Sequence, residues 1–540
     1  MSNITVFAAK KFITMDPNTP EVTHVAVRDG RILALGGKEC ANEWGTVHHD
    51  DRLAETIIMP GLVEGHAHMM AGAVWKYAYV GYHDRIDPSG NLWRGLKDGS
   101  AVVAGLAEFA DSLDFDEPIV GWGFDPIFLA SERLSRIHLD EISSDRPIAI
   151  IFSNFHLMCV NSYALEMVGY DQHSNVEGVI KAPDGLPTGE LQEMAAMFPI
   201  MRRLGIDFRG LSQSPDAILA YAQVAQRAGV TTITDLFSSM EDDDVDVMLR
   251  ITNDNFPLRI VPVLGAMGDP VSFADKAERL AKRSTDKLRM GAVKLMTDGS
   301  IQGWTARVRW PGYLGGQPNG IWNTEPEMIY SLCAEMQARG IQMHIHVNGD
   351  QAAEVSLDAI QAALALNPGQ GHRHVLQHCQ MMDRDLYERA AELGCCVNIF
   401  SNHIWYFGDQ HVALTLGEGR AARMDAARSA LDAGLHIALH SDAPVTPLGP
   451  FFTAWCAVNR RTMSDRVLGS AQCLSVSEAL YAITMGAAYT LKLDAEIGSI
   501  SVGKRADFAI LGDDPTSIDP MALKDVPVLG TVSGGRVHLL

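Results

Sequence analysis

The sequence predicts an α/β protein: a (β/α)8 barrel, with a small β-sandwich domain built from both chain ends and a large insertion after the first barrel strand. Three observations predict it. Both ends alternate apolar and polar residues between glycine turns, the middle repeats a short apolar strand followed by a helical pattern, and the repeat is lost between residues 70 and 215. Strands that alternate with helices indicate parallel βα units, which can close into a barrel.

The two ends share one pattern. Residues 4–7 and 24–27 alternate in hydropathy, and Asp29-Gly30 is a hairpin turn sequence. At the other end the pattern returns in residues 497–500, 506–511 and 528–540, with Gly534-Gly535 as a turn. We therefore assign residues 1–56 and 493–540 to one composite β domain, and residues 57–492 to the barrel.

The middle of the chain supplies the repeating units. Closing them gives a barrel whose functional site lies at the carboxyl ends of the strands. Residues 70–215 are rich in glycine, proline and aromatic residues, and we expect this insertion to cover the site. The expected barrel strands after the insertion are residues 230–234, 258–264, 292–296, 342–346, 374–378, 396–400 and 436–439.

Composition excludes several classes of function. The 66 acidic and 44 basic residues give a net charge of −22, so phosphate backbones and anionic lipids are poor partners. No apolar run reaches the ~20 residues of a membrane span, and the first residues lack the order of a signal peptide. The eight cysteines include no CxxC pair, which argues against a disulfide framework. We expect a cytoplasmic protein with a small-molecule partner.

A His-x-His pair follows the first apolar strand of the barrel segment. His66 and His68 come after residues 56–59, and a strand directs alternate side chains to the same side. Two imidazoles at one strand end can share a metal ion. Such pairs also occur by chance, so the pair alone is a weak signal.

Later strands are also followed or closed by residues that can bind a metal ion. His346 and His378 close two expected strands, and Asp442 follows another. Because the carboxyl ends of parallel strands meet at one face of a barrel, these side chains should converge with His66 and His68. Core packing explains such a set poorly, and the sequence predicts a metal site.

Lys294 stands inside the otherwise apolar strand 292–296. Its stem could lie along the barrel wall while the amine reaches solvent. It could also pair with Asp298 or act as a Schiff-base nucleophile. The interpretation we favour is that burial makes the amine neutral and that it takes up carbon dioxide, giving a carbamate that bridges two metal ions.

These motifs resemble the metal-dependent amidohydrolase superfamily over essentially the whole chain. The resemblance rests on the Pro60-Gly61 start with its His-x-His pair, the later histidines and the Ser441-Asp442-Ala443-Pro444 segment. Residues 293–300, 346–350 and 161–165 resemble, more narrowly, the subgroup of large amidohydrolases that includes N-substituted formamide deformylases.

The resemblance implies a role for each motif residue. His66, His68 and Asp442 would hold one divalent ion, His346 and His378 a second, and carboxylated Lys294 would bridge them, with zinc as the expected metal. In such enzymes metal-activated hydroxide attacks the carbonyl, and the residue matching Asp442 is the general acid and base. Because such enzymes commonly form homodimers, the resemblance also implies a homodimer. Relatives usually have Asp before the His-x-His pair and Glu before the later His, where this chain has Glu64-Gly65 and Gln377; we expect these positions to orient ligands.

Further residues are candidates for substrate contact. His156 and Glu193 lie in the insertion at positions that match the family. Trp304, Arg307 and His403 follow strand ends, with ordinary loop packing as the alternative.

The predicted function is metal-dependent hydrolysis of a non-peptide amide bond in a small, partly apolar molecule. The alternative is a deaminase, isomerase or decarboxylase on the same barrel, because a fold does not fix a reaction.

Overall fold

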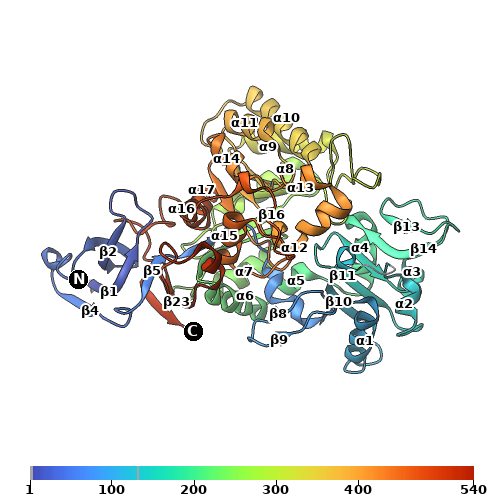
Figure 1. Cartoon of the computed structure of the whole chain (residues 1–540), viewed down its shortest axis with the longest axis horizontal. Coiled ribbons are helices and arrows are strands. Elements are labelled where there is room, and N and C mark those ends of the chain that lie inside the picture. The colour runs from blue at the N-terminus through green and yellow to red at the C-terminus, as the bar shows by residue number, and fades with distance from the viewer. Residues whose placement is uncertain (1–3, 130–132) are drawn as a thin grey trace.

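The computed structural model describes residues 4–129 and 133–540, except for the side chain of Arg209. Strands from both chain ends form one eight-stranded sheet, in the order β24-β23-β22-β5-β1-β2-β3 with β4 paired to β1. Figure 1 shows this sheet at the end of the molecule where blue and red strands meet. Its strands are β1 (Ile4–Ile13), β2 (Glu21–Arg28), β3 (Arg31–Gly36), β4 (Val47–Asp50), β5 (Ile57–Pro60), β22 (Phe508–Leu511), β23 (Val528–Ser533) and β24 (Arg536–Leu539).

Two details of this sheet differ from the sequence prediction. The β5 strand, which we expected to lead into the barrel, pairs with β1 and β22 of the terminal sheet instead. Residues 497–500 form no strand, because Gly498 adopts a positive φ of 87° that breaks the extended backbone. The expected hairpin turn is present: Asp29 and Gly30 have φ of 54° and 73°, as a type I′ turn requires.

The middle of the chain forms the predicted barrel. Eight strands make one sheet in the order β21-β20-β19-β18-β17-β16-β15-β6, and every neighbouring pair in it is parallel. All seven strands expected after the insertion are confirmed. The barrel strands are β6 (Leu62–Glu64), β15 (Val230–Ser238), β16 (Arg259–Gly265), β17 (Val293–Met296), β18 (Met343–Val347), β19 (Val375–His378), β20 (Cys396–Ile399) and β21 (Ile437–Leu439).

Helices cover the outside of the barrel because each has an apolar face. In α9 (Pro326–Ala338), for example, Ile329, Leu332, Cys333 and Met336 are buried at helical spacing in the largest core cluster. The other helices of this part of the chain are α6 (Pro215–Arg227), α7 (Asp242–Ile251), α8 (Pro270–Ala281), α10 (Asp350–Leu366), α11 (Arg384–Glu392), α12 (His403–Gln410), α13 (Glu418–Ala421), α14 (Ala427–Asp432), α15 (Pro450–Asn459), α16 (Val476–Tyr481) and α17 (Ala487–Thr490).

The insertion has a sheet of its own, which the sequence analysis did not predict. Its strand order is β13-β14-β12-β11-β10-β7, and β11 (Ile148–Phe152) is buried along its whole length. A strand buried on both faces is continuously apolar rather than alternating. The remaining elements are β7 (Ala78–Tyr79), β8 (Arg85–Ile86), β9 (Leu92–Trp93), β10 (Ile119–Phe124), β12 (Leu157–Val160), β13 (Val179–Lys181), β14 (Pro187–Gln192), α1 (Gly99–Ala110), α2 (Arg136–Asp140), α3 (Ser162–Val168), α4 (Glu193–Arg203) and α5 (Phe208–Ser212).

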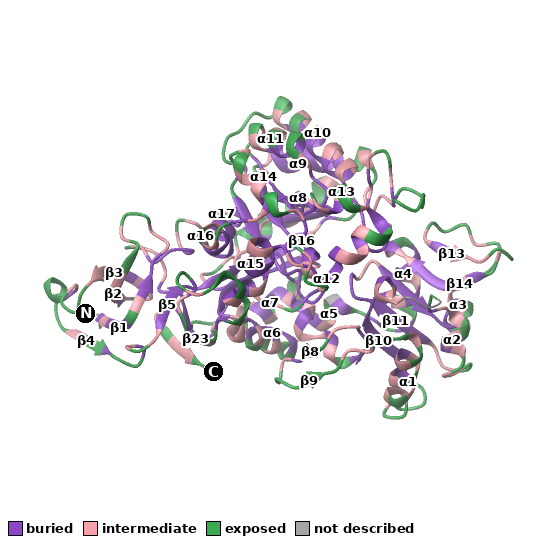
Figure 2. Ribbon diagram, viewed as in Figure 1, coloured by how far each residue is buried: buried purple, intermediate pink, exposed green. Residues whose placement is uncertain are grey.

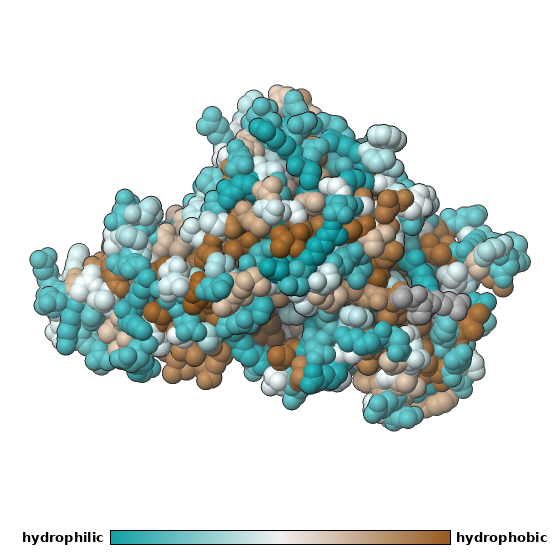
Figure 3. Space-filling view, in the orientation of Figure 1, coloured by the Kyte–Doolittle hydropathy of each residue, from teal (hydrophilic) through white to brown (hydrophobic). Residues whose placement is uncertain are grey.

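Burial follows this organisation. Figure 2 shows buried strands in the barrel and in the insertion, with exposed residues concentrated on outer helices and loops. Figure 3 shows one face of the molecule, where apolar residues gather in a band across the middle and hydrophilic ones dominate both ends. Among the described residues, no helix is long and apolar enough to cross a membrane.

Candidate metal centre

The predicted metal ligands converge at the carboxyl ends of the barrel strands. His66 and His68 follow β6, Lys294 lies in β17, and Asp442 follows β21. Together with His346 of β18 and His378 of β19, they line one cavity of about 260 Å³. The structure therefore brings together all six residues that the sequence analysis assigned to the metal site.

Asp442 lies at the middle of this set. Its Oδ1 atom is 3.3 Å from His66 Nε2 and 3.2 Å from His68 Nε2, and its Oδ2 atom is 4.0 Å from His378 Nδ1. The rings of His346 and His378 are 4.5 Å apart. Asp442 and His378 have positive φ values of 52° and 70°, a strained conformation for residues with side chains, and such strain clusters at functional sites.

Hydrogen bonding at His66 tests whether the set fits a cation. The Gln377 amide oxygen accepts from His66 Nδ1 at 2.8 Å, so the lone pair of His66 Nε2 faces the Asp442 carboxylate. Burial lowers the pKa of His66 well below its usual value, which keeps this ring neutral. Two acceptor atoms that face each other need a cation between them. The donor set of imidazole and carboxylate is the one that zinc prefers, so these residues fit a divalent metal ion.

Lys294 is fully buried, which excludes the idea that its amine reaches solvent. Burial lowers the pKa of Lys294 to about 7, and its Nζ has no hydrogen-bond partner among the described residues. The alternative ion pair with Asp298 is wrong. The Asp298 carboxylate accepts instead from backbone N–H groups of Arg307, Asn348 and Gly349, at 2.8–3.1 Å. The amine is therefore left available for chemistry.

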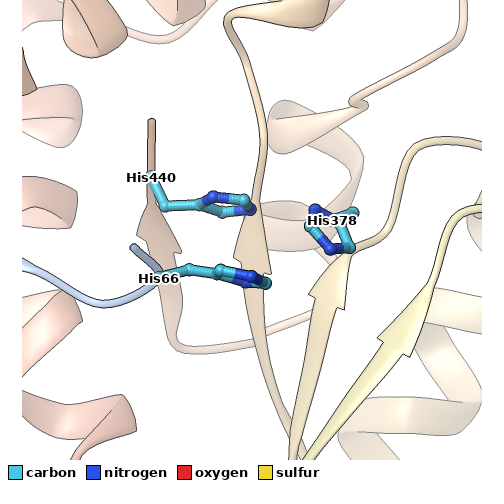
Figure 4. Close-up of side chains that lie close together, drawn as sticks. All are labelled: His66, His378 and His440. Carbon is cyan, nitrogen blue, oxygen red and sulfur yellow. The ribbon is translucent and has the colours of Figure 1, made fainter. Parts of the chain in front are cut away.

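His440 is a neighbour of the centre that the sequence analysis did not assign. Its ring is stacked on that of His66, 4.5 Å away and tilted by 13°, and on the other side lies Phe400 at 4.9 Å. Figure 4 shows the His440 and His66 rings one above the other, with both side chains directed toward His378. Candidate ligand atoms of these three residues lie within 4.8 Å of one another. The signal was available, since His440, like Asp442, comes just after the barrel strand β21.

Gln377 and Glu64 are the two residues that the sequence analysis expected to orient ligands. Besides accepting from His66, Gln377 donates through Nε2 to His344 Nδ1 at 2.8 Å, so it links two histidines. Glu64 accepts from Ser441 Oγ at 2.9 Å and from the backbone N–H of His66 at 3.3 Å. Burial raises the pKa of Glu64 to about 8. Both residues orient segments that carry ligands.

The insertion contributes His156 and Glu193 to the same cavity. His156 Nδ1 is 2.8 Å from Glu193 Oε2, which also accepts from Asn323 Nδ2 at 2.8 Å. Burial opposes the charged form of His156, but the Glu193 carboxylate outweighs it and the pKa of His156 rises. A side chain at Gly299 would meet Glu193 Oε1 at 2.1 Å, so only glycine allows this approach.

The other three substrate-contact candidates lie outside the described lining of this cavity. His403 Nδ1 pairs with Asp425 at 3.2 Å. The Arg307 guanidinium donates to the Gly320 carbonyl at 2.7 Å. Trp304 packs in a separate apolar cluster. Their placement gives substrate contact no support and agrees with ordinary loop packing.

Comparison with known proteins identifies the family to which the chain belongs. Residues 53–538 match the model of the amidohydrolase family. The chain belongs to this family. It is 28% identical to Protein LONG AFTER FAR-RED 3 of Arabidopsis thaliana, over 97% of this chain and 89% of that protein. It is 24% identical to the N-substituted formamide deformylase of Arthrobacter pascens, over 97% and 96%.

A solved structure shares the fold. An uncharacterized metal-dependent hydrolase from Pyrococcus horikoshii has a TM-score of 0.72 and 19% identity, covering 96% of this chain and 99% of that one. Family, barrel and ligand set agree, and the protein is a metal-dependent hydrolase of the amidohydrolase family.

Proposed function

We propose that this enzyme hydrolyses a non-peptide amide bond, the C–N bond at a carbonyl, in a small and partly apolar molecule. The relative that deformylates N-substituted formamides supports this bond type. The cavity supports the substrate size: about 260 Å³ holds a small molecule and not a folded partner.

The residues divide into two sets of ligands for about two divalent ions, with zinc as the expected metal. His66, His68 and Asp442 lie close enough together to hold one ion. His346 and His378 are assigned to the other by the resemblance and by the short separation of their rings. When bound, such ions lower the pKa of water and polarise a carbonyl oxygen.

Lys294 is assigned as the bridge. Burial lowers the pKa of Lys294 to about 7, which favours the neutral amine over the ammonium. A neutral amine adds to carbon dioxide: a C–N bond forms, one proton leaves, and the product is a carbamate anion with two oxygens. This anion would satisfy the unpartnered buried nitrogen and balance the charge of the ions.

Asp442 is assigned as the proton carrier. Burial opposes its negative charge, but the hydrogen bond from His68 and the surrounding positive groups hold the pKa of Asp442 at about 2, so it is ionised at neutral pH. An ionised carboxylate can accept a proton from the attacking water and deliver it to the leaving nitrogen. His156, fixed by Glu193, lines the cavity beside His346 and is assigned to hydrogen-bond the substrate.

One observation carries this proposal: a neutral His66 nitrogen faces the Asp442 carboxylate inside a buried ring of ligands. The test is a panel of N-substituted formamides, amides, carbamates and cyclic amides, assayed with zinc-reconstituted enzyme. Hydrolysis of at least one class that is lost on chelation is the expected result. Turnover of only aminopurines or aminopyrimidines, with one ion per chain, would replace the proposal with the deaminase alternative.

A further inference from the structure

One wall of the cavity is made by methionines from the insertion. Six methionines line the cavity, and three of them, Met194, Met197 and Met201, come from α4. Their spacing of three and four residues puts them on one face of that helix. Phe198, also in the lining, is 56% exposed, so α4 borders the mouth of the cavity.

Three polar residues that line the cavity donate hydrogen bonds to the protein itself. The Ser212 hydroxyl donates to the Phe208 carbonyl, and the Thr324 hydroxyl donates to the Met296 carbonyl at 2.6 Å. Asn323 donates to Glu193 and to the Asp298 carbonyl. What this wall presents to a ligand is therefore apolar surface.

Methionine suits such a surface. Its unbranched, flexible side chain and polarizable sulfur adapt to ligands of different shape, which is why methionines are frequent at binding surfaces with broad specificity. Met194 and Met201 are only partly buried, so they retain surface that a ligand could cover. By contrast, Met197 is 2% exposed and packs in the apolar cluster of the insertion.

The helix also begins at the polar end of the site. Glu193, its first residue, has a φ of 60° and holds His156 through the 2.8 Å contact. The methionine face thus starts beside the group that lies against His346 and continues away from it toward the mouth.

We propose that the methionine face of α4 binds an apolar arm of the substrate, an alkyl or aryl group of several carbons attached next to the scissile bond. This inference rests on the proposed function for the position of that bond. It makes the substrate class an N-substituted amide with a hydrophobic substituent of variable shape.

The direct test measures binding without turnover. A fluorescent probe, N-phenyl-1-naphthylamine, is displaced from the metal-loaded enzyme by 1-alkanols of four to eight carbons. The affinity should rise roughly fourfold per methylene, as burial of each methylene predicts. In the double variant Met194→Gln/Met201→Gln this rise should fall below about twofold per methylene, because the arm then meets amide groups.

The matched control is Met167→Gln. Met167 is partly buried in the same apolar cluster of the insertion, as Met201 is, but does not line the cavity. It should keep the wild-type dependence on chain length. If the double variant does not fold, the single variant Met201→Gln replaces it. Met201 is only partly buried, so this variant should fold, and it must still weaken the dependence of affinity on chain length. Equal slopes in wild type and folded variants, or no length dependence in the wild type, would overturn the proposal.

The same series separates this inference from the proposed function. Hydrolysis of N-alkylformamides is assayed in parallel. Loss of the alkanol length dependence in the α4 variants without any amide hydrolysis would refute the proposed reaction but keep the apolar arm. If the enzyme hydrolyses amides but the α4 variants leave the length dependence unchanged, the proposed reaction is kept and the apolar arm is refuted.

Discussion

The two sides of the cavity are built in opposite ways. The barrel side consists of polar, buried side chains from strand ends that are far apart in the sequence, such as His66, Lys294 and Asp442. The insertion side includes helix α4, which turns an apolar and partly exposed methionine face to the cavity. On the proposed function, this difference assigns the chemistry to the barrel side and the substrate fit to the insertion side. Changes on the barrel side should reduce kcat and metal content, and changes on the insertion side should alter KM and selectivity.

The largest effect is expected for Lys294→Ala. Removing the bridging group should release metal and abolish measurable activity, since both ions lose a shared ligand. Short carboxylic acids should restore part of both, because they can occupy the place of the carbamate. Metal content and rate are measured with and without added propionate. A variant with full metal content and wild-type rate would make Lys294 a structural residue.

Asp442→Asn comes next. The amide keeps the size of the side chain but cannot take up a proton, so kcat should fall by about 10²- to 10⁴-fold. Substrate should still bind, and the melting temperature should change little. Steady-state kinetics, metal analysis and thermal unfolding are measured on one preparation. Near-wild-type kcat in a metal-replete variant would remove Asp442 from the proton transfer.

Gln377→Leu tests the orientation of a ligand. Without the amide oxygen, His66 loses the partner that fixes its Nδ1 proton. Loss of such a supporting hydrogen bond typically weakens metal binding about 10- to 100-fold. Competition with a chromogenic chelator gives the affinity. Gln377→Glu keeps an oxygen acceptor for His66 Nδ1 and should retain tight binding. Equal affinity in the wild type and both variants would show that Gln377 is dispensable.

Glu193→Gln tests the insertion side and should have the smallest effect. The amide still fits beside His156 but no longer supplies a charge, so the pKa of His156 should fall. In the wild type the charged ring persists to higher pH; in the variant it is lost at lower pH. KM should rise about two- to tenfold, as for one weakened hydrogen bond, with metal content unchanged. A large loss of metal in this variant would break the division between the two sides.

The barrel and the barrel side of the site could be predicted from the sequence, because the patterns that indicate them are local in the chain. The repeat of an apolar strand followed by a helical pattern located all seven later barrel strands. The His and Asp residues at or after some of these strand ends then located the barrel side of the site. The sheet of the insertion was not found, since its strands do not alternate regularly with helices as the barrel strands do. For example, β11 is followed directly by β12, and the two pair antiparallel. Trp304, Arg307 and His403 show a further limit: following a strand end does not tell whether a side chain turns into the cavity or into the loop packing. That depends on contacts between distant segments.

The central claim is that the barrel side works as a metal centre. Elemental analysis of the purified protein, combined with chelation and zinc add-back during an amide hydrolysis assay, tests it most directly. We predict about two divalent ions per chain, loss of activity when they are removed while the fold is retained, and recovery on adding zinc. A metal-free protein with full activity would contradict the account.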